Sequence, residues 1–185
     1  TRSLCDWSSD VCSSDLRTVG TLVVWLDNQQ APGAWSAVVG SGATQNATNN
    51  QPSSALIGSR PALSFDGVND SLSMPVIPML AWHAFAVVNP AASGSATVLQ
   101  IAASGTASFT LSASTPGLQV ISASGGSASA TATYGVDSRV GAGWDGGALK
   151  NFYRGLIGEV LVYSGVLGAG EATAVSRYLA GKWGV

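Results

Sequence analysis

Short apolar runs separated by turn residues follow one another along most of the chain. This spacing, with Gly, Ser, Asn and Pro between the runs, is typical of an antiparallel β-sandwich or barrel. In the segment Phe109–Ser112 apolar and polar residues alternate, as expected of a strand with one buried face. We predict strands over Thr21–Leu26, Pro61–Phe65, Ser71–Met74, His83–Asn89, Ala96–Ala102, Ser108–Ser112, Leu118–Ser122, Ala128–Tyr134, Ser138–Trp144 and Leu156–Tyr163.

Two connections between these strands carry distinctive residues. The polar stretch Asp27–Gln51 predicts a long loop, with Trp35 folded over the core as an apolar cover. The sequence Asp-Gly-Val-Asn-Asp at 66–70 predicts the turn of a hairpin between its two flanking strands, because Asp-Gly and Asn-Asp favour turn conformations.

One helix is predicted, over Ala169–Lys182. Its apolar residues recur with a period near 3.6, so we expect this stripe to pack on a face of the sheet. Gly184 can end the helix, and the basic residues Arg177 and Lys182 suit its C-terminal half. The apolar stripe consists of Ala172, Val175, Tyr178, Leu179 and Trp183.

Composition narrows the class of protein. A chain of 185 residues suffices for one domain with a sizeable core, and 46% apolar against 10% charged residues is too apolar for disorder. A formal net charge of −2 provides no basic field for nucleic acid, and no apolar run is long enough for membrane insertion. The many small polar residues of the loops are common in secreted and virion-surface proteins, so we expect an extracellular or virion-associated protein.

The N-terminal segment stands apart from the rest. Residues 6–16, Asp-Trp-Ser-Ser-Asp-Val-Cys-Ser-Ser-Asp-Leu, resemble the translation of a common short-read sequencing adapter. We therefore expect residues 1–16 not to belong to the fold and the domain to span 17–185. This removes Cys5 and Cys12 and leaves a domain without cysteine, which offers no disulfide or thiolate metal site. We also expect the natural N-terminus to be missing and the chain to be part of a longer polypeptide.

Three passages together resemble a known family. They are Asn46–Pro52 leading to Arg60–Asp70, then His83–Pro90 with Gly143–Gly146, and finally Leu156–Tyr163 with Tyr178–Gly184. Their order and spacing are similar to the laminin-G-like family of the concanavalin A-like lectin and glucanase superfamily. The resemblance, which covers Val19–Val185, implies an all-β, antiparallel two-sheet jelly-roll sandwich with one short C-terminal helix.

The chain departs from the family pattern in one place. Members continue after the passage matching Trp144-Asp145-Gly146 through a hairpin and another strand, whereas here Lys150–Gly155 leads almost directly into Leu156. We expect a hairpin to be missing near residues 147–155. Either this subgroup has a trimmed sheet, or the sequence is a damaged assembly there.

Catalytic residue types are sparse. Glycosidases need two carboxylates at a set separation, yet the predicted domain has only two glutamates, Glu159 on a strand and Glu171 on the helix. Asp66 and Asp70 are four residues apart, but a turn lies between them. His83 is the only histidine, and its aromatic neighbours indicate a packing or hydrogen-bonding role at a strand end. We therefore expect a protein that is not an enzyme and has no catalytic residues.

A calcium site is an open alternative at one turn. Asp66, Asn69 and Asp70 offer oxygen ligands of the kind that Ca²⁺ prefers, and relatives in the superfamily often bind calcium on loops. The same residue types are also ordinary in a tight turn, which is the interpretation we favour.

Carbohydrate binding usually involves an exposed aromatic ring that stacks on sugar. The candidate ligand-binding residues are Trp35, Trp82, Tyr134 and Trp144. The alternative is that tryptophans are buried; for Trp25, Trp144 and Trp183 we consider core or sheet–helix contacts.

These observations favour a non-catalytic binding module that recognises carbohydrate or a cell-surface ligand within a larger extracellular or virion protein. One alternative is a structural or interaction domain of a phage tail or adhesin with no small ligand. A less favoured one is a glycoside hydrolase. The expected partners are a glycan or a surface protein, without nucleic acid.

Overall fold

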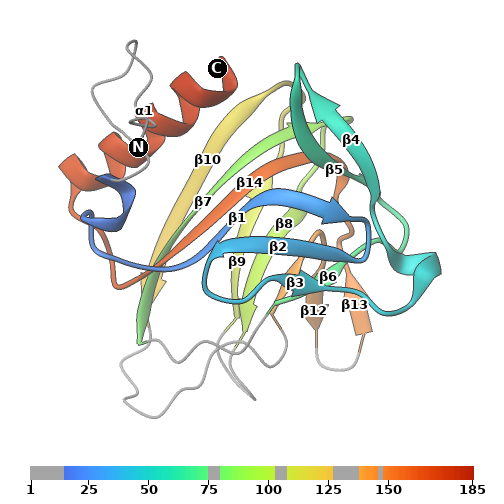
Figure 1. Cartoon of the computed structure of the whole chain (residues 1–185). Coiled ribbons are helices and arrows are strands. Elements are labelled where there is room, and N and C mark those ends of the chain that lie inside the picture. The colour runs from blue at the N-terminus through green and yellow to red at the C-terminus, as the bar shows by residue number, and fades with distance from the viewer. Residues whose placement is uncertain (1–14, 75–79, 103–107, 127–137, 146–147) are drawn as a thin grey trace.

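The fold is mostly antiparallel sheet with one helix at the C-terminal end (Figure 1). The computed structural model describes residues 15–74, 80–102, 108–126, 138–145 and 148–185. The predicted all-β class with one short C-terminal helix is confirmed. That helix, α1 (Ala169–Trp183), is the only α-helix of the described residues, and it is neither long nor apolar enough to cross a membrane.

The remaining elements are strands and two single turns of 3-10 helix. The turns are η1 (Asp15–Arg17) and η2 (Thr48–Asn50). The strands are β1 (Thr21–Ala31), β2 (Ala34–Val39), β3 (Ala43–Thr44), β4 (Ser53–Ile57), β5 (Arg60–Asp66), β6 (Leu72–Ser73), β7 (Ala81–Pro90), β8 (Ala96–Ala102), β9 (Ser108–Ala113), β10 (Gln119–Gly126), β11 (Arg139–Val140), β12 (Gly143–Asp145), β13 (Ala148–Lys150) and β14 (Arg154–Ser164).

Hydrogen bonds join most of the strands into one path. Its order is β10-β7-β14-β1-β2-β3-β6-β11-β8-β9, with β5 joined to β14 and β4 to β5, while β12 and β13 form a separate hairpin. The path curls so that its two ends face each other, and the rings of Trp82 on β7 and Phe109 on β9 are in contact. Strands from both ends of the path therefore share one core, which includes Ala84 and Val160 from one side and Leu99 and Leu111 from the other.

A second apolar cluster lies between the outer face of the sheet and α1. On β7, Ala84 and Ala86 face the inner core, whereas Phe85 and Val87 face the helix side. This follows from the alternation of side chains along a strand. Strands buried on both faces read as continuous apolar runs, which is why β7 and β14 were predictable from the sequence.

The predicted loop Asp27–Gln51 is wrong over most of its length. β1 continues to Ala31, the chain turns at Pro32-Gly33, and β2 and β3 follow. The end of β1 is polar and β3 has only two residues, whereas β2 is apolar but lies within a largely polar stretch. Their pairing within the sheet decides their conformation. Trp35 lies on β2 inside the core rather than on a loop over it.

The predicted hairpin around residues 66–70 is also wrong, although the turn itself is present. β5 pairs with β4 and β14, while β6 pairs with β3 and β11. The local hairpin is instead β4–β5, which turns at Gly58-Ser59 with Gly58 at φ +60°. Turn chemistry is local, whereas the choice of partner strand depends on distant packing, so the sequence identified the turn and not the pairing.

Three further expectations concern the limits of elements. Ser138–Trp144 is divided into β11 and β12, and β12 pairs with β13 in a short hairpin directly before β14. The strand predicted over Ala128–Tyr134 lies outside the described residues. At the N-terminal end the described fold begins at Asp15, two residues before the predicted domain boundary, and Leu16 is fully buried against the helix-side cluster.

Candidate functional site

A buried polar cluster lies between α1 and strands β1 and β14. It depends on a β-bulge in β14, where the pairing with β7 shifts register between Ile157 and Glu159. Ile157 faces the inner core, and Glu159, two residues on, faces the helix, which a regular strand would not allow. The bulge thus aims a carboxylate into the second apolar cluster.

Glu159 has no exposed surface and receives three charged or polar donors. Trp25 Nε1 donates to Oε1 at 2.6 Å, and Trp183 Nε1 donates to Oε2 at 2.6 Å. Lys182 Nζ lies 2.9 Å from Oε2 and also donates to Asp27 Oδ1 at 2.7 Å. The cluster therefore connects β14, β1 and the last turn of α1.

The electrostatics of this cluster follow from its burial. Loss of hydration raises the pKa of Glu159, and the carboxylate of Asp27 adds to this. Lys182 and the indole N–H of Trp183 oppose the shift by favouring the charged form. Both carboxylate oxygens accept from donors of the protein and Glu159 has no solvent access, so in this conformation it is not available to a substrate.

The second glutamate has a separate structural task. Glu171 Oε2 accepts a hydrogen bond of 2.8 Å from the backbone N–H of Gly168, at the residue where α1 begins. The N-cap itself is a glycine and supplies no side chain. Glu171 thus satisfies one of the free donors at the helix N-terminus and also suits the helix dipole.

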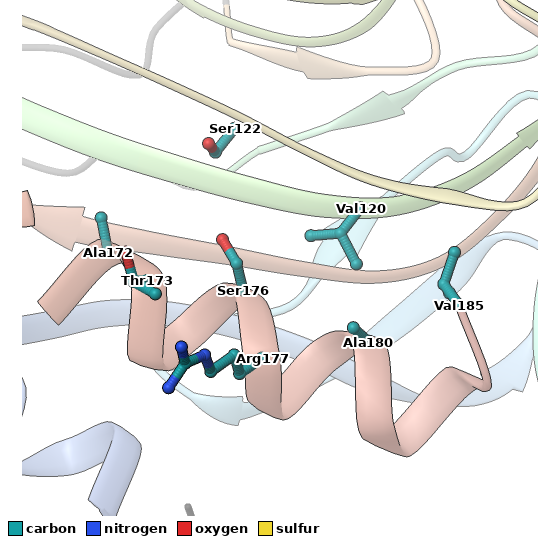
Figure 2. A pocket seen from close by; sticks show the side chains of 8 residues that line it. All are labelled: Val120, Ser122, Ala172, Thr173, Ser176, Arg177, Ala180 and Val185. Atoms are coloured by element: carbon teal, nitrogen blue, oxygen red, sulfur yellow. The ribbon is translucent and has the colours of Figure 1, made fainter. Parts of the chain in front are cut away.

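An open groove of about 470 Å³ runs between α1 and β10 (Figure 2). Val120 and Ser122 line it from the strand, and the helix side is formed largely by small residues. Among the described residues that line it, Arg177 is the only one with a charged side chain. The groove's lining from the helix consists of Ala172, Thr173, Ser176, Arg177, Ala180 and the terminal Val185. Nothing in the sequence alone marked these residues as a group, because only the docking of α1 beside an edge strand brings them together.

The turn proposed as a calcium site is held by its own hydrogen bonds. Asp66 Oδ1 accepts from the backbone N–H groups of Val68, Asn69 and Asp70, at 2.7, 3.2 and 3.4 Å. Asp70 Oδ2 accepts from the N–H of Asp66 at 2.9 Å. The described residues contain no group of three or more His, Cys, Asp or Glu that could hold a metal ion. These contacts account for the acidic residues as turn residues, and calcium binding stays a prediction.

The structure places two of the four candidate sugar-stacking residues in the core. Trp35 is 1% exposed and Trp82 is 4% exposed, so neither ring offers a face to solvent. Tyr134 lies outside the described residues, and of Trp144 only the backbone, in β12, is described. The four residues therefore do not form a described binding surface. Trp25 and Trp183 do make the sheet–helix contact considered for them.

His83 is a buried packing residue, as its sequence neighbours indicated. Its ring stacks on Phe85 with centroids 4.6 Å apart, and its Nδ1 has no hydrogen-bond partner. Burial lowers the pKa of His83. A neutral imidazole is the form that such surroundings favour.

Comparisons with known proteins give no family to which the chain can be assigned. No model of a known protein family matches the chain, and no curated protein is significantly similar to it in sequence.

Proposed function

We propose that the chain is a non-catalytic binding module of a larger extracellular or virion protein, with a carbohydrate or another cell-surface molecule as its ligand. The finer architecture belongs to the same proposal: a laminin-G-like jelly roll of the concanavalin A-like superfamily, whose two sheets correspond to the two ends of the curled strand path. The passages that resemble that family support both parts.

One observation carries the non-catalytic half of the proposal. Glu159 and Glu171 are the chain's only glutamates, and each is engaged in a structural contact, the first without any solvent access. A glycosidase needs an acid and a second carboxylate, both facing the scissile bond. Neither glutamate offers this arrangement, and Asp66 and Asp70 accept backbone N–H groups of their own turn.

Two assays test the proposal together. The purified chain is applied to a glycan array and incubated with soluble β-glucans, and release of reducing sugar is measured. We expect binding to a restricted set of glycans and no hydrolysis. Hydrolysis that disappears in a folded Glu159→Gln variant would contradict the non-catalytic assignment.

A structural or interaction domain without a small ligand is the second candidate. The burial of Trp35 and Trp82 favours it, because no described aromatic ring among the candidates remains to stack on a sugar. A glycan array without any hit, together with stable association of the chain with a protein of the same virion or adhesin, supports this candidate over the first.

A further inference from the structure

The strand on one side of the groove is an edge strand. β10 is hydrogen-bonded to β7 along its whole length, from Gln119 opposite Val88 to Gly126 opposite Ala81, and within the described residues it has no partner strand on its other side. Such an edge presents backbone N–H and C=O groups that can pair with another extended chain. Among the described side chains of this strand, the exposed ones are small, Ser122 and Ser124.

The helix residues that face this strand across the groove have small side chains. Ala172, Ser176 and Ala180 follow one another at intervals of four, so they share one face of α1. The large side chains of the helix, among them Leu179 and Trp183, instead pack on the sheet. From 172 to 180 the helix rises about 12 Å, which matches about four residues of an extended chain. The alternate side chains of an added strand would have room in this space.

The charge of the groove indicates which kind of peptide would bind in it. Arg177 is exposed at the groove, and no described residue pairs with its guanidinium. The hydroxyl groups of Ser122 and Ser176 also line the groove (Figure 2). A guanidinium and hydroxyl donors together suit a carboxylate, since charge-assisted hydrogen bonds are the strong ones. None of the described residues that line the groove has an acidic side chain that would oppose such a ligand.

We propose that the groove between β10 and α1 binds an extended acidic segment of a partner protein, which adds as a strand to the edge of β10 and places a carboxylate on Arg177. This goes beyond the proposed function, because it names a site and a ligand class, and it can fail while the chain remains a non-catalytic module. The edge strand favours a peptide over a carbohydrate, since a sugar has no backbone to continue the sheet.

The test is a selection with random twelve-residue peptides displayed on phage, against the whole chain. A Ser176→Trp variant, which fills the groove, serves for counter-selection, and Ser53→Trp on the exposed strand β4 is the matched control. We expect enriched peptides rich in Asp or Glu with alternating apolar residues. Their binding, measured by fluorescence anisotropy, is expected to vanish in Ser176→Trp and to persist in Ser53→Trp.

Two further measurements separate the parts of the proposal. Arg177→Glu is expected to weaken peptide binding about tenfold or more, the loss of one charge-assisted contact, whereas Arg154→Glu at an exposed site away from the groove leaves it unchanged. N-methylation of alternate peptide nitrogens is expected to abolish binding, because it removes the donors that pair with β10. Should Ser176→Trp fail to fold, the arginine pair and the N-methylated peptides still decide the question.

Three results would overturn the proposal. One is a selection that yields no groove-dependent peptide, and another is peptide binding that tolerates N-methylation or charge reversal at Arg177. The third is a glycan whose binding is blocked by Ser176→Trp, which would assign the groove to carbohydrate. Only that last result would also locate the ligand site of the proposed function.

Discussion

At Glu159 a fully buried side chain meets the donors of two buried tryptophans and of a lysine whose side chain is 14% exposed, from two other elements. Removing a buried acceptor leaves its donors without partners, and this destabilises the fold by more than the net contribution of the lost hydrogen bonds. We expect Glu159→Ala to lower the free energy of unfolding by about 3–5 kcal/mol, the range found when one member of a buried ion pair is deleted. Urea unfolding followed by tryptophan fluorescence measures this.

The other glutamate of the chain provides the control. Glu171 is exposed and accepts one hydrogen bond, from the N–H of Gly168, so Glu171→Ala is expected to cost about 1 kcal/mol or less. If the two variants were equally stable, the buried cluster would not be what holds α1 on the sheet.

Gly158, at the bulge, is a second residue whose identity follows from packing. A Cβ at this position would lie 2.6 Å from the ring of Trp183, which is closer than side chains pack. We expect Gly158→Ala to destabilise the fold by about 1–3 kcal/mol, because the indole must move away from its bond with Glu159. The measurement is the change in the midpoint of chemical unfolding at constant slope.

Gly170, in the first turn of α1, is the matched position for this substitution. A Cβ there meets nothing within 4 Å, and alanine is the better helix former. Gly170→Ala is therefore expected to be neutral or stabilising, by up to about 1 kcal/mol. Destabilisation by both changes would mean that the loss of glycine flexibility, and not the contact with Trp183, is the cause.

Among the elements, the turn after β5 shows how far local sequence determines local structure. Asp66 accepts three backbone N–H groups, so its removal leaves three donors to water. We expect Asp66→Ala to cost about 0.5–2 kcal/mol, by analogy with the loss of a helix cap, and Asp66→Asn to cost less because its amide oxygen can still accept. Thermal unfolding of both variants, with and without millimolar Ca²⁺, measures this and also tests calcium binding.

A stabilisation of the parent protein by Ca²⁺ that Asp66→Ala abolishes would establish the metal site. Equal melting temperatures with and without the ion would leave Asp66 and Asp70 as turn residues alone. Equal losses in the alanine and asparagine variants would contradict the hydrogen-bonding role given to Asp66.

Sequence patterns predicted some elements well and others not at all, for physical reasons. β7, β8, β14 and α1 carry long apolar runs or a clear helical period, and the structure confirms them with shifts of a few residues at their ends. β3 has two residues and β4 begins with two serines, while the apolar β2 lies within a largely polar stretch, and the conformation of all three depends on their partner strands. The candidate site was less predictable still. No periodicity shows that Glu159 turns toward the helix, since that depends on a bulge, or that Ser122 lies opposite Ser176.

For the molecule as a whole, two buried groups, His83 and Glu159, make the free energy of unfolding change with pH in opposite directions. Burial lowers the pKa of His83 from its usual 6.5, so the unfolded chain takes up a proton that the folded chain resists. The free energy of unfolding therefore decreases as the pH falls from about 6.5 toward the pKa of His83 in the folded chain. Burial raises the pKa of Glu159 above its usual 4.5, so the folded chain keeps a proton that the unfolded chain releases. The stabilisation that results is fully present below pH 4.5 and is lost as the pH rises through the pKa of Glu159 in the folded chain.

These two effects can be separated by substitution. His83→Gln removes the titrating group, and we expect its free energy of unfolding to fall less steeply than that of the parent between pH 6.5 and pH 5. Glu159→Gln removes the opposing group, and its stability is expected to decline more steeply with acid than that of the parent between the folded pKa of Glu159 and pH 4.5. Urea unfolding at half-unit steps of pH gives both slopes. The sign of each difference in slope decides the question, because the slope is proportional to the difference in the number of protons bound by the unfolded and folded states. A His83→Gln profile parallel to that of the parent would mean that His83 titrates normally, and its burial against Phe85 would then not exclude the charged ring.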